Sequence, residues 1–369
     1  MQYAVDRRCQ FHRLEYVFGG IFLALLLPGI SSDCAHAELL GPTGRPELTT
    51  DVARYSPTEQ VSGSYRIVGS DTMQTMLRRL TSEFRRRQPN VDLSIAGGGS
   101  AKGVSDFLGR NGDKPKGSRF VPQPGAGKPV ILASSRTMAT SEIQEFAAAH
   151  GYEPTVIPIA MDAVAFYVYK DNPIVSLTLD QVDGIFSSTR RRGQPKPLDT
   201  WGQLGLTGAW EGAQIRLYGR DKKSGTREFV RETVLMGGEF DEAIHEEPGA
   251  ASVILALSRD EFGIGYSGLG LMASSVRIVP LAEKAGDPTV APTVTAVMDG
   301  SYPLRRYLYL YVDNSPKTGL PPAIREFLAF LNSREGRDAV VATGFYPVPI
   351  RAVDRPQAAM AAPAHKPMP

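Results

Sequence analysis

The sequence predicts an α/β fold with mixed, mostly parallel sheets, because short apolar segments typical of strands alternate with segments typical of helices. The clearest observation is a unit that occurs three times: a strand, a turn rich in glycine and hydroxyl residues, and the start of a helix. The three units begin near residues 65, 91 and 214. The 369 residues, 42% of them hydrophobic and 22% charged, suffice for about two globular domains.

The first two units lie close together in the sequence. The first has a strand over 65–68, a turn over 69–72 and apolar residues at helical spacing from 73 to 84. The second has an alternating strand over 91–95 and a glycine-rich turn over 97–100 before its helix. In parallel sheets, ligands bind beyond the carboxyl ends of the strands, which is where these helices are expected to begin.

The later elements continue the alternation of strand and helix. We expect, in order, an exposed loop over 111–129, a strand over 130–133, a helix with capping-box spacing at 141–144, a long apolar strand over 156–169, a helix with capping-box spacing at 178–181, the third unit over 214–229, a return strand and turn over 263–268, a strand over 302–312 and a helix over 324–331. The sequence has no internal repeat of fixed period.

Both ends of the chain have the composition of segments outside the folded part. Residues 1–37 contain three arginines, an apolar run over 17–27 and a small-residue cleavage motif that ends at Ala37, which predicts a secretory signal peptide. The run is shorter than the about 20 apolar residues of a membrane-spanning helix, so we expect the protein in the bacterial periplasm or outside the cell. Residues 38–63 are interpreted as a leader, and residues 351–369, rich in alanine and proline, as a disordered tail.

Composition argues against several functions. The formal net charge of +2 is far from the strongly basic balance of an electrostatic nucleic-acid binder. Both cysteines, Cys9 and Cys34, lie in the predicted signal peptide, so the mature chain offers no thiol nucleophile, disulfide or cysteine-based zinc site. Its histidines are far apart in sequence, and it has no paired carboxylate motif. We therefore expect no enzyme activity, no cofactor and no metal.

Three predicted helix starts carry hydroxyl residues, at 70–72, 100–103 and 224–226, and glycine lies within or beside each of them. Backbone N–H groups in a first helical turn lack internal partners and carry partial positive charge, so such ends attract anions. Taken singly, these residues are ordinary N-caps. The third start is preceded by Arg220, a permanent cation that can hold an oxyanion in bidentate fashion. Together, the three starts and the arginine predict an oxyanion site.

Short motifs in this sequence occur in the order of one known family. The strongest is an arginine at 220 followed by Ser-Gly-Thr at 224–226; the others lie at 69–73, 97–104, 133–136, 171–173, 185–187, 201, 263–266 and 344–348. On these motifs, which extend from Tyr65 to Pro349, the chain resembles the PstS family, the periplasmic phosphate-binding proteins of phosphate ABC importers.

The resemblance implies the type II periplasmic-binding-protein fold, in which two lobes are joined by two crossing segments, here near 159–164 and 262–266. Lobe I would comprise 64–160 plus 265–350, and lobe II 161–264. The resemblance also implies a monomer that holds inorganic phosphate between the lobes and delivers it to a membrane permease driven by a cytoplasmic ATPase. The alternatives are a binder of another oxyanion (sulfate, molybdate or an organic phosphate), a secreted phosphatase-type enzyme, and an adhesive surface protein without a ligand.

The family's phosphate-contacting positions can be carried over to this chain. They are Ser70, Thr72, Met73, Ser100, Ser135, Arg136, Arg220, Ser224, Gly225 and Thr226, with Met73 contacting phosphate through its backbone. The best-known members have an aspartate after the serine of the third site strand, where it accepts the proton of hydrogen phosphate, whereas here Arg136 follows Ser135. We expect Asp71 or Asp162, each near a ligand-facing strand end, to replace that acceptor. An inward-facing Arg136 would instead favour a more highly charged anion.

Overall fold

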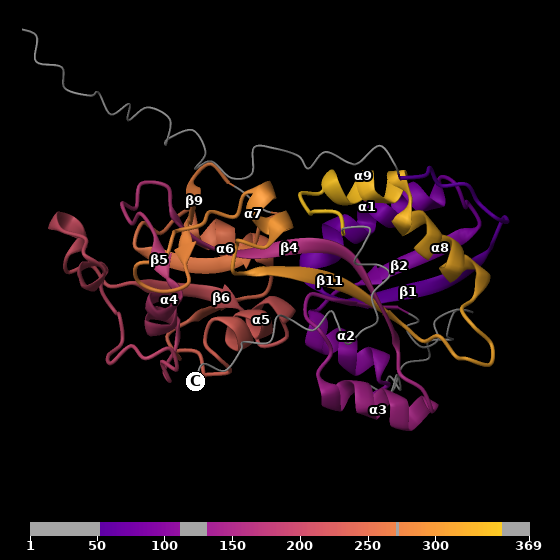
Figure 1. The fold of residues 1–369 in the computed structure, drawn as a ribbon, viewed down its shortest axis with the longest axis horizontal. Helices are drawn as coiled ribbons and strands as arrows, with labels where there is room; N and C mark the ends of the chain where they lie inside the picture. The colour runs from indigo at the N-terminus through magenta and orange to yellow at the C-terminus, as the bar shows by residue number, and fades with distance from the viewer. Residues whose placement is uncertain (1–51, 111–130, 271–272, 349–369) are drawn as a thin grey trace, which may run out of the picture. The chain divides into compact units, whose positions relative to one another are not determined.

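One mixed sheet runs through the described part of the protein. The computed structural model describes residues 52–110, 131–270 and 273–348, so the expected signal peptide, most of the leader, the loop over 111–129 and the tail lie outside the described residues. Within those ranges, nine strands form this sheet in the order β2-β1-β3-β11-β4-β8-β6-β7, with β9 paired to β4 (Figure 1). Its strands are β1 Gly63–Gly69, β2 Val91–Ala96, β3 Ile131–Ser134, β4 Thr155–Tyr169, β6 Arg216–Arg220, β7 His245–Glu247, β8 Gly263–Gly268, β9 Val276–Val279 and β11 Arg305–Val312.

Parallel and antiparallel pairs occupy different parts of this sheet. β1 pairs in parallel with β2 and β3, and β6 pairs in parallel with β7 and β8. Between these two parts, the long strands β4 and β11 pair antiparallel with each other, and also with β8 and β3, respectively. Two short strands, β5 Leu177–Thr178 and β10 Leu281–Ala282, pair separately. The predicted α/β fold with a mixed sheet is confirmed.

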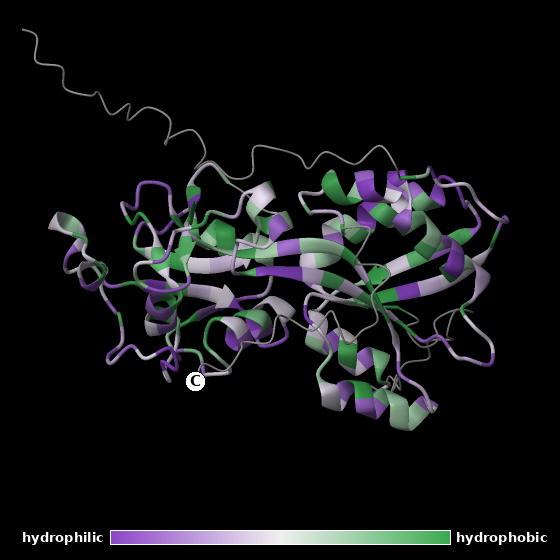
Figure 2. Ribbon diagram, in the orientation of Figure 1, coloured by the Kyte–Doolittle hydropathy of each residue, from purple (hydrophilic) through white to green (hydrophobic). Residues whose placement is uncertain are grey.

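Amphipathic spacing and capping account for the helices. The apolar residues expected at helical spacing over 73–84 form the buried face of the first long helix, which includes Leu77, Leu80 and Phe84. Figure 2 shows hydrophobic and hydrophilic residues interspersed along the helices. The helices are α1 Gln74–Arg85, α2 Ser100–Phe107, α3 Thr140–His150, α4 Leu179–Phe186, α5 Gly225–Thr233, α6 Ala250–Leu257, α7 Val294–Asp299, α8 Pro322–Asn332 and α9 Arg334–Val341, with 3₁₀ turns η1 Asp71–Met73, η2 Trp201–Leu204 and η3 Gly208–Trp210. In this part of the chain, none of them has the length and apolar character that crossing a bilayer requires.

The apolar core of the described residues has three clusters, and the largest of them differs from the expected division into lobes. This cluster joins residues of β4, β6 and β8 to residues from Leu269 to Leu304. The reason is that β9 pairs with β4 and α7 packs on the same strand. Residues 269–304 therefore share a core with residues 161–257, whereas the sequence analysis placed them with residues 64–160.

Candidate oxyanion-binding site

Three helix starts meet at one place, although their residues are far apart in the sequence. They follow β1, β2 and β6: η1 leads into α1, and the other two are α2 and α5. Thr72 Oγ1 lies 3.1 Å from Thr226 Oγ1, which joins the first start to the third. The Ala101 N–H donates a hydrogen bond to the Lys223 carbonyl at 3.2 Å, which joins the second to the third. The structure thus brings together the three ends in which the sequence predicted an oxyanion site.

Gly225, the first residue of α5, marks the closest approach between these segments. A Cβ atom at this position would lie 2.5 Å from the Oγ atoms of both Ser100 and Ser135. Ser100 Oγ accepts a hydrogen bond from the Ser135 N–H at 3.1 Å and lies 3.2 Å from Ser135 Oγ. Because glycine has no side chain, the α5 backbone can come this close to two buried hydroxyl groups.

Ser224 caps α5 and keeps a hydrogen to donate. Its Oγ accepts hydrogen bonds from the N–H groups of Thr226 at 3.1 Å and Arg227 at 3.4 Å. A hydroxyl that accepts these bonds still has its own hydrogen, which can be donated to another group. Ser224 is therefore an ordinary N-cap, and the same geometry leaves it able to bind an anion at the start of the helix.

Arg220, the last residue of β6, has buried donors without partners. The residue is only 1% exposed. Its Nη2 donates to the Pro248 carbonyl at 3.1 Å and lies 3.8 Å from Asp71 Oδ2. Its Nε and Nη1 have no hydrogen-bond partner among the described residues. Burial lowers the pKa of Arg220, but a guanidinium remains charged in proteins, so these donors require an acceptor that the described residues do not supply.

The first helix start contributes groups of different kinds. Ser70 Oγ is buried without a partner among the described residues. Asp71 Oδ1 accepts hydrogen bonds from the Gly98 N–H at 2.8 Å and Gln74 Nε2 at 2.7 Å, so this carboxylate also fixes the turn before α2. The Met73 side chain is fully buried in the core, and its N–H donates to the Ser70 carbonyl at 3.3 Å.

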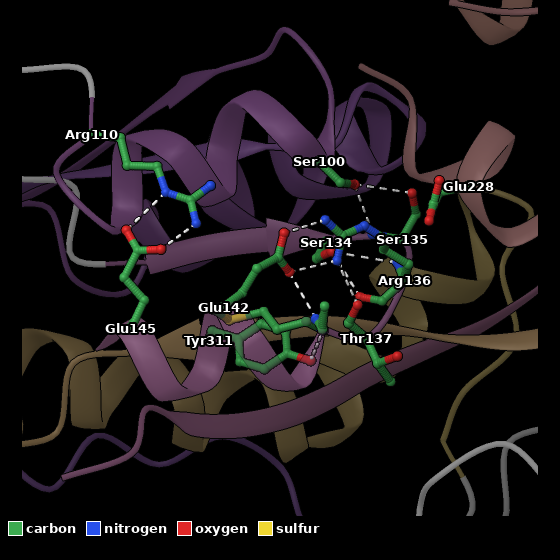
Figure 3. A network of polar contacts seen from close by, with 12 residues as sticks. Ser100, Arg110, Ser134, Ser135, Arg136, Thr137, Glu142, Glu145, Glu228 and Tyr311 are labelled. Atoms are coloured by element: carbon green, nitrogen blue, oxygen red, sulfur yellow. Dashed lines mark hydrogen bonds and ion pairs between the residues drawn. The ribbon is translucent and has the colours of Figure 1, made fainter. Parts of the chain in front are cut away.

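The side chain of Arg136, which the sequence analysis placed among the phosphate-contacting positions, pairs with a residue outside this cluster. Figure 3 shows its guanidinium directed toward Glu142 on α3, to which it donates at 2.7 and 2.8 Å. Burial alone would lower the pKa of Arg136, but the hydrogen bonds and charge of Glu142 raise it above its ordinary value. Glu142 is fixed in turn by the Ala139 N–H at 2.8 Å. Ser135, one residue earlier, is the residue that faces Ser100.

The sequence analysis missed a second buried arginine in the cluster, Arg306 on β11. Its side chain is 3% exposed and forms an ion pair with Asp162, which stands directly opposite on β4. Nε and Nη2 donate to Asp162 Oδ2 at 3.0 and 2.7 Å. The same guanidinium donates to the Ser135 carbonyl at 3.2 Å and to Thr226 Oγ1 at 3.0 Å.

A sequence signal for this pair existed. Asp162 is a charged residue within the apolar run over 156–169, and a buried carboxylate requires a cation or several donors. The partner could not be named, because the pairing of β4 with β11 joins residues 144 positions apart. In the described ranges, no group of three or more His, Cys, Asp or Glu side chains is placed to hold a metal ion.

Comparisons with known proteins identify the family of this chain. The family model for the PBP superfamily domain matches residues 56–335. The phosphate-binding protein PstS of Pseudomonas aeruginosa is 38% identical, over 82% of this chain and 88% of that protein. Among solved structures, an ABC-type phosphate transport receptor from Vibrio cholerae superimposes with a TM-score of 0.57 at 21% identity, covering 77% of this chain and all of that chain.

A phosphate-binding protein from Stenotrophomonas maltophilia has a TM-score of 0.55 at 15% identity, covering 78% of this chain and 91% of that one. At such identities the two structures bear on the fold alone, and both have the fold described above. The family model and the Pseudomonas relative each cover more than two thirds of the chain. On these grounds, the chain belongs to the PBP superfamily and, within it, to the family of the phosphate-binding protein PstS.

Proposed function

We propose that this protein is an extracytoplasmic solute-binding protein that captures inorganic phosphate at the cluster of helix starts and delivers it to the membrane permease of an ABC importer. The relatives that carry the name PstS are phosphate-binding proteins, which supports phosphate as the anion. The predicted signal peptide, with cleavage near Ala37, supports a location in the periplasm or outside the cell. We further propose that the protein acts as a monomer and that a cytoplasmic ATPase drives the permease.

The observation that carries this proposal is the state of Arg220. Two of its nitrogen atoms are buried without a partner among the described residues, Arg220 comes four residues before Ser224, the N-cap of α5, and its guanidinium lies 3.8 Å from Asp71 of the first helix start. Leaving such donors unpaired costs free energy, and an oxyanion with several acceptor oxygens would satisfy them together. The planar fork of a guanidinium matches two oxygens of phosphate, while the N–H groups of a helix start can hold the others.

We propose that phosphate contacts come from both sides of the cluster. Thr72, Met73, Ser70, Ser100 and Ser135 would contribute from one side; Arg220, Ser224, Gly225 and Thr226 would contribute from the other. The sides would belong to two lobes that close on the anion, and their boundary is better placed near residue 304 than near 265, since residues 269–304 share the core of β4 and β6. Such a site performs binding without bond chemistry.

Two carboxylates remain candidates for accepting the proton of hydrogen phosphate. Asp71 Oδ2 lies 3.8 Å from Arg220 Nη2, next to the unpartnered donors. Asp162 Oδ1 is a buried acceptor that has no partner among the described residues. A protonated phosphate oxygen could donate to either one, whereas fully deprotonated sulfate could not, so each would favour phosphate over sulfate.

Calorimetric titration of the purified protein, stripped of bound ligand, tests the proposal. Phosphate should bind with a dissociation constant in or below the micromolar range, arsenate should compete with it, and sulfate and molybdate should bind much more weakly. Tighter binding of sulfate or molybdate would support the alternative oxyanion, and hydrolysis of a phosphate ester, assayed with and without divalent metals, would support an enzyme. Failure to bind any of these anions would contradict the proposal.

The acceptor is tested separately by the variants Asp71→Asn and Asp162→Asn. An amide keeps the shape of the carboxylate, and its –NH₂ group could donate to sulfate. The variant that lacks the acceptor should therefore lose discrimination between phosphate and sulfate in a competition experiment. Unchanged discrimination in both variants would exclude both carboxylates from this role.

A further inference from the structure

Arg306 connects three segments of the cluster through one buried guanidinium. It lies on β11 in the middle of the sheet, where it donates to Asp162 on β4 and to the Ser135 carbonyl after β3. Its Nη2 also donates to Thr226 Oγ1 on α5 at 3.0 Å. The guanidinium lies over the Phe229 ring of the same helix, 5.4 Å from the ring centre. All of these contacts lie in the interior of the protein.

The bond to Thr226 decides the direction in which that hydroxyl can act. An arginine N–H can only donate, so Thr226 Oγ1 must be the acceptor in this pair. The hydroxyl hydrogen of Thr226 is then directed away from Arg306 and can be donated to another group; Thr72 Oγ1 lies 3.1 Å away, and either hydroxyl of that pair can be the donor. A donor presented on that side, at the start of α5, is what an anion requires.

We propose that Arg306 is a positioning residue, which fixes the Thr226 hydroxyl as a donor toward the bound anion. This inference rests on the proposed function and adds to it a residue that acts through Thr226. Asp162 balances the charge of Arg306 at 2.7 Å and holds the fork in place, so Arg306 contributes orientation and adds little net charge to the site. Arg220 differs from it, because its nearest carboxylate oxygen is 3.8 Å away and two of its nitrogens are free of partners among the described residues.

A double-mutant cycle separates orientation from charge. The variants are Arg306→Lys, which keeps the charge but loses the planar fork, and Arg306→Gln, which keeps an amide donor but loses the charge. Each is made in the wild-type background and in Thr226→Val, which has a similar shape without the hydroxyl. Phosphate affinity is measured by calorimetry, and folding is checked by the melting temperature without phosphate.

In the wild-type background, both Arg306 variants should weaken phosphate binding by about tenfold, the cost of one misdirected charge-assisted hydrogen bond. In the Thr226→Val background, the same changes should alter the affinity by less than about twofold, because the hydroxyl through which Arg306 acts is gone. The matched control is Arg277→Lys, a change at a partly buried arginine whose guanidinium donates to the carbonyls of Asn172 and Ile174. It should leave the affinity unchanged.

Two results would overturn the inference. Equal losses in the two backgrounds would mean that Arg306 acts independently of Thr226, and full affinity in Arg306→Lys with a loss in Arg306→Gln would mean that its charge alone matters. If one Arg306 variant does not fold, the other completes the cycle. A wild-type protein that binds no phosphate would reject the proposed function, and this inference with it, whereas wild-type binding with additive losses would reject this inference alone.

Discussion

Two arginines near the end of a strand, the buried Arg220 and the partly buried Arg136, are similar in sequence context but differ in what surrounds them. Arg136 lies two residues after the end of β3 and donates to both oxygens of Glu142. Arg220 ends β6, and its nearest carboxylate oxygen, on Asp71, is 3.8 Å away. The guanidinium of Arg136 therefore has hydrogen-bond acceptors within the protein, whereas Arg220 has two buried nitrogens without partners in the described part of the chain.

This difference teaches that an unpaired donor indicates a binding site better than position along the chain does. A folded protein satisfies nearly all its buried polar groups, so an arginine that remains unsatisfied has either a ligand or a cost in stability. Arg136 and Glu142 stabilise the start of α3, since Glu142 also accepts from the Ala139 N–H. Within the described ranges, the Arg220 guanidinium donates one hydrogen bond, to the Pro248 carbonyl, and approaches Asp71 only to 3.8 Å.

The largest effect is expected from Arg220→Met, with Arg136→Met as its matched counterpart. Loss of two charge-assisted hydrogen bonds should weaken phosphate binding by about a thousandfold in Arg220→Met, while Arg136→Met should stay within about twofold of the wild type. For stability, the order of the two variants should be reversed. Without phosphate, Arg136→Met should lose about 1–3 kcal/mol of unfolding free energy, and Arg220→Met should lose none.

Thermal denaturation with and without phosphate measures both quantities at once. Phosphate at about 100 times its dissociation constant should add about 2.7 kcal/mol of stability wherever it binds. It should therefore raise the melting temperature of the wild type and of Arg136→Met, and leave that of Arg220→Met unchanged. Equal phosphate responses in the two variants would remove the distinction between the arginines.

The same contrast explains how much could be predicted from the sequence. The helix starts were predicted because local signals define them: glycine, hydroxyl residues and apolar spacing all lie within a few positions, as around Ser224 and Gly225. The direction of Arg136 was not predicted, because its partner Glu142 lies on the next helix, which begins at Thr140. The residue with which Arg136 pairs depends on how the segment after β3 packs against α3.

Arg306 and the packing of residues 269–304 against β4 were not predicted, for a related reason. Arg306 belongs to the site only because β11 lies between β3 and β4, and both pairings bring together residues more than 140 positions apart. Likewise, β9 pairs with β4 although about 110 residues separate them. This pairing places residues 269–304 in the apolar core that contains β4 and β6. Periodicity identifies strands, but it does not give their order in a sheet.

An intermediate effect is expected from Gly225→Ala, which tests whether phosphate binding requires the close approach of α5 to Ser100 and Ser135. The added methyl carbon would lie 2.5 Å from Ser100 Oγ and Ser135 Oγ, so α5 must move away from the two serines and phosphate binding should weaken by about tenfold. The control is Gly212→Ala, where a Cβ has no atom within 4 Å, and its affinity should equal that of the wild type. Calorimetry on both variants measures this, and unchanged affinity in Gly225→Ala would mean that α5 does not close on the serines.

The smallest effect concerns the pH dependence of stability, which Glu142→Gln isolates. Burial alone would raise the pKa of the Glu142 carboxyl, but the hydrogen bonds and charge of Arg136 hold it below the ordinary 4.5. The contribution of Glu142 is therefore complete above its unfolded-state pKa and is lost as the pH falls through the lower folded-state pKa. Urea unfolding should show the variant about 1 kcal/mol less stable than the wild type at pH 7, with the difference shrinking below about pH 4.

Glu145→Gln on the same helix is the control for this last comparison, because Glu145 pairs with Arg110 while exposed to solvent, and its loss should matter less. Phosphate affinity of Glu142→Gln gives the sharper outcome. If Glu142 alone keeps Arg136 out of the site, removing its charge should free the guanidinium to turn toward Ser135 and strengthen anion binding. Unchanged affinity would mean that packing around α3, together with the bond to the Thr137 carbonyl, suffices to hold Arg136 away.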